Sequence, residues 1–436
     1  MKLLFYLFYF IFINTFLVQA YIDPGTGSML FAVLTGIIST LFFAGKTIFI
    51  KLRTLPFWYG KSAKQAEAGK KKFVFYSEGK QYWNVFKPVI DEFIKRGLEC
   101  TFYTSDENDP ALEVESDFVK TEFIGKGNKA FSKLNMLEAD ICLMTTPGLD
   151  VYQLERSKGV KHYSHILHAV DDTTLYKLFS FDYYDSMFLS GEYQKESIRE
   201  LEAKRGTKEK ELYVTGSTYL DVLSSKIENL DIQKKNGLIT VLVSPSWGDN
   251  SLLQRFGMKL LLPLVKSDMH VILRPHPQSS ISEKELLEKL KNQLEGYKNV
   301  EWDFSRENIV SMARSDIMIS DFSGIMSDYL FLFSKPVIYT RYEFDKRGYD
   351  LSDVDGEPWK FRMLKEAAAE ISEENFDDVS AIIKKTIASD VVSKKIEEAK
   401  NTAWFYQGKA GIKCADALEG IYSRLENSSI EAGAEK

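Results

Sequence analysis

The sequence contains few cysteines and no excess of positive charge. Its three cysteines, Cys100, Cys142 and Cys414, are odd in number and far apart, which argues against a disulfide framework and against a cysteine-based zinc site. Its 56 lysines and arginines are outnumbered by 62 aspartates and glutamates. Without a global basic field, the chain is not expected to bind nucleic acid, and any anion site must be built locally.

The rest of the composition is that of a globular protein, with 44% hydrophobic and 27% charged residues among 436. These values exclude a mainly disordered or fibrous chain. The length is compatible with two folded domains and an additional segment. No internal repeat or long low-complexity tract is present.

The N-terminus is far more apolar than this average. No charged residue lies between Lys2 and Asp23, and a second uncharged interval of similar length follows. Each interval is long enough to cross a bilayer as a helix. We predict a membrane anchor over residues 1–53, with a transmembrane helix at 29–50. Residues 1–20 form either another membrane helix or a signal peptide that is cleaved off.

A basic segment follows the predicted anchor. Residues 46–72 contain eight lysines and arginines against one acid, Glu67. By the positive-inside rule this flank stays in the cytoplasm, so the domains that follow are predicted to lie at the cytoplasmic face of the cell membrane. Residues 54–72 are predicted to be a basic linker, either solvated or in contact with anionic headgroups.

Short apolar runs then alternate with amphipathic helical patterns. FVFYS at 73–77 precedes a helical pattern at 83–96, and LITVLVSPS at 238–246 precedes one at 252–265. This alternation favours parallel sheets with helices on both faces. We predict an α/β protein of two facing doubly wound domains with a cleft between them. The predicted segments are a first domain at 73–225, a second at 237–360, a helical region at 361–427 that packs across both, and a flexible tail at 428–436.

Ligands of open α/β sheets bind beyond the carboxyl ends of the strands, so polar residues there form the candidate site. Arg274-Pro275-His276-Pro277 follows the apolar run MHVIL. A permanent cation and an imidazole on a loop fixed by prolines suit the binding and polarising of a phosphate. Arg274 has an ion pair with a neighbouring carboxylate as its alternative. Trp247 is predicted to be a core aromatic, with stacking on a ligand ring as the alternative.

A second candidate, Ser320-Asp321-Phe322-Ser323-Gly324, lies between a predicted strand and a predicted helix. A helix N-terminus offers free N–H groups and partial positive charge to an anion. Ser323 and Gly324 would allow phosphate oxygens to come close. An ordinary helix cap has the same sequence pattern, so that alternative stays open.

Three histidines, His162, His165 and His168, form the third candidate. Their spacing of three resembles that of metal ligands on a helix, but the segment also fits a strand that ends at the predicted cleft. His168 comes last and is therefore predicted to reach the cleft as a general base. Asp171 or Asp172 would orient it, or would cap the next helix instead.

In their order, these segments resemble the CDP-glycerol glycerophosphotransferases, relatives of teichoic acid polymerases and primases with a GT-B-like fold. The resemblance extends from His168 to Lys409. It departs from the family at Ala169–Asp172, where members have glycine and proline, and in VTGSTYLD, which lacks the usual arginine. The similar segments are FDYYDSMFLSGEYQKESI, VTGSTYLD, VSPSW, RPHP, SDFSG, PVIYTRYEFDKRGY and YQGKA.

The resemblance implies transfer of glycerol phosphate, or a similar alditol phosphate, from a CDP-alditol to a lipid-linked glycan or polyol phosphate acceptor at the membrane. No cofactor and no protein-bound metal are expected. A nucleotide-sugar glycosyltransferase and a noncatalytic membrane scaffold of the same fold are the alternatives. The catalytic residues implied are His168 and His276, and the substrate-binding residues are Arg274, Ser320, Asp321, Ser323 and Gly324.

Overall fold

A computed structural model describes most of the chain after the predicted anchor. The described residues are 70–230, 237–305, 307–321, 323–341 and 344–434, with 35–37, 40, 41 and 45. None of the helices in these ranges has both the length and the apolar character needed to cross a membrane. The predicted signal peptide, nearly all of the predicted anchor and most of the predicted linker lie outside the described residues.

The unit Lys70–Lys436 contains two parallel sheets among its described residues. The first has seven strands in the order β3-β2-β1-β4-β5-β6-β7. Phe73 and Phe75 of β1 pack on one face of this sheet, while Val74 and Tyr76 pack on the other. Burial of both faces explains why such strands are continuous apolar runs. The strands are β1 (Lys71–Ser77), β2 (Cys100–Thr104), β3 (Val119–Phe123), β4 (Glu138–Met144), β5 (Gly159–Ile166), β6 (Ser186–Leu189) and β7 (Glu211–Val214).

The helices of this first lobe follow from apolar residues at helical spacing. Helix α4 buries Val85, Phe86, Val89, Ile90 and Phe93, and ends at a glycine in the left-handed conformation,. The elements are η1 (Lys80–Tyr82), α4 (Trp83–Arg96), η2 (Pro110–Glu113), α5 (Asn128–Leu134), η3 (Thr173–Leu175), α6 (Gln194–Arg205) and α7 (Thr218–Glu228).

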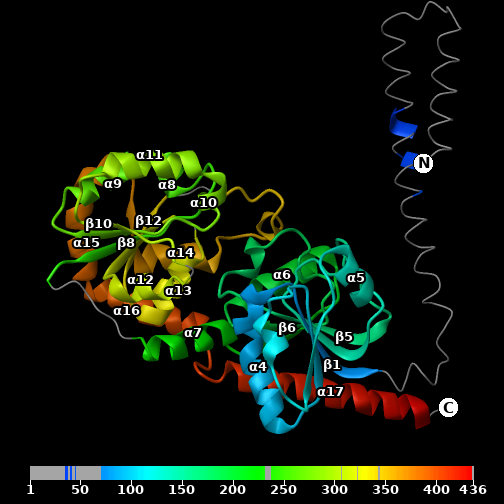
Figure 1. Ribbon diagram of the computed structural model, residues 1–436. Coiled ribbons are helices and arrows are strands. Elements are labelled where there is room, and N and C mark those ends of the chain that lie inside the picture. The colour runs from blue at the N-terminus through cyan, green and yellow to red at the C-terminus, as the bar shows by residue number, and fades with distance from the viewer. Residues whose placement is uncertain are drawn as a thin grey trace, which may run out of the picture. The chain divides into compact units, whose positions relative to one another are not determined.

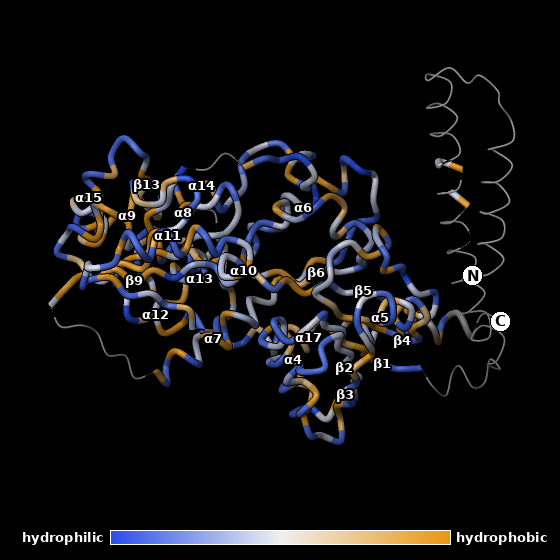
Figure 2. Tube along the Cα trace, turned by 45° about the horizontal axis from the view of Figure 1, so that its top comes forward, coloured by the Kyte–Doolittle hydropathy of each residue, from blue (hydrophilic) through white to orange (hydrophobic). Residues whose placement is uncertain are grey.

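The second sheet has six parallel strands in the order β10-β9-β8-β11-β12-β13. Val241 and Val243 of β8 pack on one face, and Leu242 packs on the other. Orange, hydrophobic segments run along the strands in Figure 2. The strands are β8 (Thr240–Val243), β9 (His270–Leu273), β10 (Val300–Trp302), β11 (Ile317–Ser320), β12 (Val337–Thr340) and β13 (Ala368–Ile371).

The helices of this second lobe complete the described elements (Figure 1). Helix α16 packs against α13 and α14, whereas α17 returns to the first lobe and packs against α4. The C-terminal helices therefore join the two lobes. The elements are α8 (Leu252–Arg255), α9 (Met258–Val265), α10 (Ser279–Ser282), α11 (Lys284–Leu294), α12 (Ile309–Arg314), α13 (Ile325–Phe333), η4 (Asp350–Ser352), α14 (Trp359–Ala367), η5 (Glu373–Asp378), α15 (Val379–Ile387), α16 (Asp390–Ala403) and α17 (Ala410–Ala434).

Three elements differ from the sequence analysis. Strands β3 and β13 were not predicted; both are edge strands, which do not need an apolar run on both faces. The single helix predicted at 252–265 is two helices, α8 and α9. Gly257 separates them with a φ of 44°, a conformation that ends a right-handed helix.

Both sheets begin at a central strand and extend outward in two directions, which confirms the predicted α/β architecture of two parallel sheets. The direction reverses between β1 and β4 in the first sheet and between β8 and β11 in the second. Such switch points are where open α/β sheets bind ligands. They direct attention to the loops that follow these four strands.

Candidate functional site

Hydrogen bonds tie together the loops after β8 and β11. The Ser320 hydroxyl donates to the Ser244 carbonyl at 2.6 Å. The Asp321 carboxylate accepts from the Ser246 N–H and hydroxyl groups at 2.9–3.1 Å and from the Leu252 N–H at 2.9 Å. Ser320 and Asp321 are almost fully buried. Both were predicted to bind substrate; in the structure their side chains accept or donate hydrogen bonds that join the switch-point loops.

The guanidinium of Arg274 is also engaged within the second lobe. It donates to the Asp303 carboxylate at 2.5 Å and to the hydroxyl and carbonyl groups of Ser305 at 3.1 and 2.7 Å. Burial raises the pKa of Asp303, but hydrogen bonds from Ser305, Ser311 and Arg274 outweigh it and bring this pKa to about 2. The sequence left an ion pair open as one role of Arg274, and the structure contains it.

Among the residues that the structure describes, none forms a hydrogen bond with Nε2 of His276. The Gln278 N–H donates to its Nδ1 at 3.1 Å, so in the neutral ring Nε2 carries the proton. Burial lowers the pKa of His276, and the charges of Asp321 and Glu283 oppose that shift. At neutral pH the ring can therefore donate a hydrogen bond from Nε2 to an anionic oxygen.

Trp247 lies beside this imidazole, in the loop after β8. The two ring centroids are 6.3 Å apart, with the ring planes inclined at 32°. The prediction that Trp247 is a core aromatic is wrong, because its side chain is 48% exposed. The loop carries the indole out of the core, where one face can stack on a planar ligand.

Helix α13 begins next to Ser323 and Gly324, as its sequence predicts. Gly324 is its N-cap residue and is exposed, and Ser323 is half-buried. A Cβ atom added at Gly324 would lie 3.6 Å from the Oδ2 of Asp171, which belongs to the first lobe. The loops after β5 and β11 therefore meet at the helix end that was predicted to receive a phosphate.

His168 follows β5 and lies between two tyrosines. Its ring is edge-on to Tyr82, with centroids 5.1 Å apart, and its Nδ1 lies 3.5 Å from the Tyr176 hydroxyl oxygen. Burial lowers the pKa of His168, and the charge of Asp171 opposes that shift. A neutral imidazole at the carboxyl end of the sheet is suited to accept a proton, as predicted for this residue.

The other two histidines of this segment are packed within the sheet. His162 Nε2 lies 2.9 Å from the Ser186 hydroxyl, and His165 Nε2 lies 3.1 Å from the Thr145 carbonyl. They lie on a strand rather than on a helix. In the described ranges, no three His, Cys, Asp or Glu side chains converge as metal ligands.

Glu78 is a candidate that the sequence analysis missed. It follows β1 at the switch point of the first sheet. Burial raises the pKa of Glu78, and the Thr146 side chain lowers it. Burial and the charge of Glu78 both raise the pKa of Tyr82, the tyrosine edge-on to the candidate base. Glu78 directly follows the run FVFYS, and this position at the end of a predicted strand could have identified it.

Asp171 and Asp172 both reach into the second lobe. The Asp172 carboxylate accepts from the backbone N–H groups of Trp359 and Lys360 at 2.8 and 2.9 Å and so caps α14. The Asp171 carboxylate pairs with the Lys360 ammonium at 3.0 Å. The structure thus directs both acids to the other lobe, and the cap that the sequence left open is on α14 rather than on the next helix.

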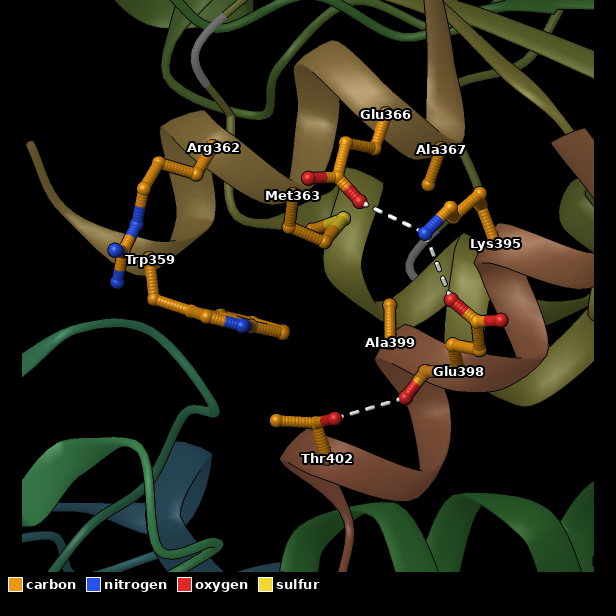
Figure 3. A pocket seen from close by; sticks show the side chains of 9 residues that line it. All are labelled: Trp359, Arg362, Met363, Glu366, Ala367, Lys395, Glu398, Ala399 and Thr402. Carbon is orange, nitrogen blue, oxygen red and sulfur yellow. Dashed lines mark hydrogen bonds and ion pairs between the residues drawn. The ribbon is translucent and has the colours of Figure 1, made fainter.

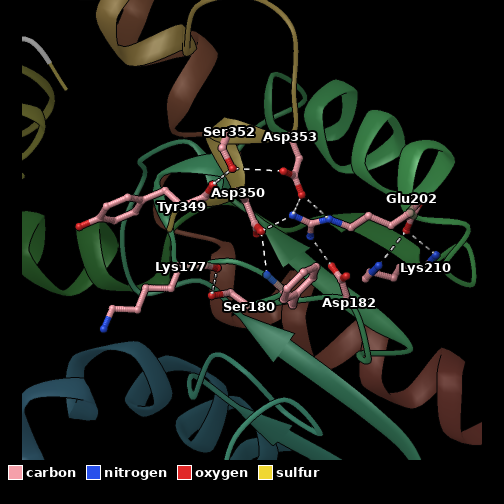
Figure 4. A network of polar contacts seen from close by, with 11 residues as sticks. Lys177, Ser180, Asp182, Glu202, Lys210, Tyr349, Asp350, Ser352 and Asp353 are labelled. Carbon is pink, nitrogen blue, oxygen red and sulfur yellow. Dashed lines mark hydrogen bonds and ion pairs between the residues drawn. The ribbon is translucent and has the colours of Figure 1, made fainter. Parts of the chain in front are cut away.

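A second contact between the lobes is made by Arg205 of α6. Figure 4 labels its three acidic partners, Asp182, Asp350 and Asp353. Its guanidinium pairs with Asp182 at 2.8 Å in the first lobe, and with Asp350 at 2.6 Å and Asp353 at 2.7 Å in the second. Burial raises the pKa of Asp350 to about 6, although Arg205 opposes this. The Asp350 N–H donates to the Tyr176 carbonyl at 2.9 Å. The network therefore holds the tyrosine beside the candidate base.

A pocket of about 350 Å³ lies between α14 and α16. Figure 3 shows the Trp359 indole at its edge and Lys395 between Glu366 and Glu398, at 3.2 and 2.9 Å. None of the predicted site residues lines it. The lining residues are Trp359, Arg362, Met363, Glu366, Ala367, Lys395, Glu398, Ala399 and Thr402.

The sequence matches one family model over residues 168–374, described as CDP-glycerol:poly(glycerophosphate) glycerophosphotransferase. The match begins at His168 and includes both His276 and Gly324. It confirms the resemblance found in the sequence. Among curated proteins, none matches the chain.

Solved structures share the fold at low sequence identity. The wall teichoic acid polymerase TagF is 17% identical, with a TM-score of 0.52 over 81% of this chain and 90% of that one. A TagF variant soaked with CDPG is 17% identical, with a TM-score of 0.55 over 90% and 99%. The UDP-GlcNAc 2-epimerase from Neisseria meningitidis, bound to UDP-GlcNAc, is 14% identical, with a TM-score of 0.53 over 80% and 100%. These likenesses are of fold, and agree with the two-sheet architecture.

Proposed function

We propose that this CDP-glycerol glycerophosphotransferase-like enzyme is of the teichoic acid type and transfers glycerol phosphate from CDP-glycerol to a hydroxyl group of a lipid-linked acceptor. The family match that includes both candidate histidines carries this proposal. An acceptor oxygen bonds to the β-phosphorus while the bond from that phosphorus to the CMP oxygen breaks. CMP leaves with the electron pair.

The second lobe would bind the donor. The Nε2–H of His276 and the N–H groups at the start of α13 would donate to the phosphate oxygens. Such donors stabilise the charge that develops in the transition state, which is the main protein contribution to phosphoryl transfer. The exposed indole of Trp247 would stack on the cytosine ring.

The first lobe would activate the acceptor. In the tautomer that has its proton on Nδ1, His168 would donate to the Tyr176 hydroxyl, and the Nε2 lone pair would take the proton of the attacking hydroxyl. Because burial lowers the pKa of His168, the ring is uncharged near neutral pH and ready to act as a base. Glu78, close enough to perturb Tyr82, would help to orient a polyol.

The direct test is release of CMP by purified full-length protein from labelled CDP-glycerol with a lipid-linked acceptor. The His276→Ala variant should lose at least about a hundredfold in rate, the usual cost of removing one such donor. His270→Gln is the matched control, since His270 is buried and bonded to Glu301 at 3.1 Å on the strand before the loop. Full activity of His276→Ala would refute the role given to this histidine.

Donor choice separates this function from the alternatives. Calorimetric titrations with CDP-glycerol, CDP-ribitol and UDP-sugars should give binding with a CDP-alditol. Turnover of a UDP-sugar without any CDP-alditol turnover would favour a glycosyltransferase. A well-folded protein that binds none of these nucleotides would favour a scaffold.

Membrane association is part of the proposal. The uncharged intervals within residues 1–53 and the basic residues that follow would keep the domains at the cytoplasmic face, near a lipid-linked acceptor,. The full chain should remain with the membrane fraction after alkaline extraction. Recovery of the whole chain in the soluble fraction would refute this anchor.

A further inference from the structure

The ion pair between Asp171 and Lys360 lies at the start of α13. The two charged groups come from different lobes, 3.0 Å apart, and their side chains are 21% and 5% exposed. The other oxygen of Asp171 lies 3.6 Å from where a Cβ atom at Gly324 would be. The Ser327 hydroxyl, in the first turn of α13, donates to Asp171 at 3.4 Å. The carboxylate therefore lies against the first turn of the helix.

This position is electrostatically similar to that of a bound phosphate. A helix N-terminus attracts negative charge through its free N–H groups, and α13 is nine residues long. Asp171 already places a negative charge there and receives a hydroxyl donor and a cation, the contacts that a phosphate oxygen would use. A diphosphate at the same helix end would be repelled by this carboxylate and attracted by Lys360.

The Lys360 ammonium has hydrogen-bond donors that could bind such a ligand. Its ammonium carries three donors, and its one ion pair in the ranges that the structure describes is with Asp171. Its charge also opposes the burial that raises the pKa of Asp172 and Asp328. Asp172 caps the same helix from the first lobe, so the lysine backbone is held in place whether or not Asp171 stays bound. The ammonium can therefore exchange one anionic partner for another without movement of α14.

We propose that Asp171 is an internal competitor of the donor diphosphate and that Lys360 is the cation for which the two anions compete. The inference rests on the proposed function and names a further donor-binding residue, together with the acid that limits donor affinity. It also explains the acidic segment that departs from the family pattern after His168. The diphosphate of a nucleotide donor must therefore displace Asp171 from Lys360.

The experiment measures CDP-glycerol affinity by calorimetry on the full-length chain. We expect Asp171→Asn to bind about three- to tenfold more tightly, and Lys360→Gln to bind at least about tenfold more weakly. Opposite effects from the two members of one ion pair are the signature of competition. An ion pair that only holds the lobes together would weaken binding in both variants, and that result would overturn the inference.

Two further variants keep the test decisive. If the lone ammonium prevents Asp171→Asn from folding, the double variant Asp171→Asn with Lys360→Met should bind CDP-glycerol more tightly than Lys360→Met alone. Equal affinity there would overturn the competition. Asp355→Asn, which breaks the exposed ion pair with Lys204 of the other lobe, is the matched control and should stay within about twofold of wild type. Wild-type protein that binds no CDP-alditol would instead refute the proposed function, and the inference with it.

Discussion

The strand ends of the two lobes use their polar residues differently. In the second lobe, Ser320, Asp321 and Arg274 are buried and bonded to neighbouring loops. In the first lobe, His168 and Glu78 are only partly buried. A polar residue at a strand end can therefore either build the loop that forms a site or face the ligand, and residue type alone does not tell the two apart.

His276 is the exception that sharpens this comparison. It shares a loop with Arg274, yet Arg274 is enclosed by an acid and a serine, whereas none of the residues that the structure describes bonds to Nε2 of His276. In the second lobe, His276 and Trp247 face outward. The loops that hold them are fixed by the buried side chains of Arg274 and Asp321. Substitutions should therefore separate into losses of stability and losses of activity.

The largest effect is expected at Asp321. Alanine there leaves the Ser246 and Leu252 donors without their buried acceptor, so the free energy of unfolding should fall by about 3–5 kcal/mol. Urea denaturation followed by circular dichroism measures it. The first-lobe counterpart Glu78→Gln, which replaces an acid whose pKa is already raised, should lose less than about 1 kcal/mol. Similar losses in both variants would contradict the comparison.

Next is the candidate base. His168→Asn should lower kcat for CMP release by about a hundredfold or more, with little change in melting temperature because the ring is half-buried. Since burial lowers the pKa of His168, the wild-type rate should fall with decreasing pH only below about 6.5. The variant should lack this acidic limb. A wild-type kcat in this variant would show that His168 is not the base.

Asp303, which accepts hydrogen bonds from Ser305, Ser311 and Arg274, predicts a dependence of stability on pH. The pKa of Asp303 is about 2 in the folded protein, below its unfolded value of about 3.9. The stabilisation is therefore complete above pH 4 and is lost as the pH falls toward 2, by about 2–3 kcal/mol. Arg274→Gln should make urea midpoints between pH 5 and 2 less dependent on pH. An unchanged dependence would indicate that this pair contributes nothing.

The smallest effect is expected at Trp247. Because its side chain is 48% exposed, Trp247→Ala should change the free energy of unfolding by less than about 0.5 kcal/mol. Loss of ring stacking should raise the KM for CDP-glycerol by about three- to tenfold. Trp247→Phe keeps an aromatic face and should restore most of the affinity. Unchanged KM in the alanine variant would leave the indole without a part in binding.

Much of the fold was predictable because burial imposes a period on the sequence. The helix predicted at 83–96 is found at Trp83–Arg96, and the runs at 73–77 and 238–246 coincide with strands β1 and β8. Strands β3 (VKTEF) and β13 (AAEI) were missed because neither contains a continuous run of large apolar residues. The break at Gly257 was missed because helical spacing continues across it.

The candidate site was only partly predictable. The loops that contain His276 and Gly324 were identified from their strand ends. The sequence left Arg274 two roles, an ion pair or a ligand contact. It left Asp171 two others, orienting the base or capping a helix. The partner of Arg274 comes from the loop after β10, and that of Asp171 from the other lobe. Such partners depend on distances across the fold, which spacing along the chain does not contain.

The sequence by itself determined the alternation of strands and helices, the strand-end loops and the resemblance to a family, because apolar periodicity and short motifs are local properties. Only the tertiary structure decided which polar side chains form hydrogen bonds inside the protein and which can contact a ligand. That decision rests on contacts between residues such as Asp171 and Lys360, far apart in the chain and 3.0 Å apart in space. The interaction energy of an ion pair between two lobes depends on the distance between the charges and on their burial, and both are fixed only when the chain folds.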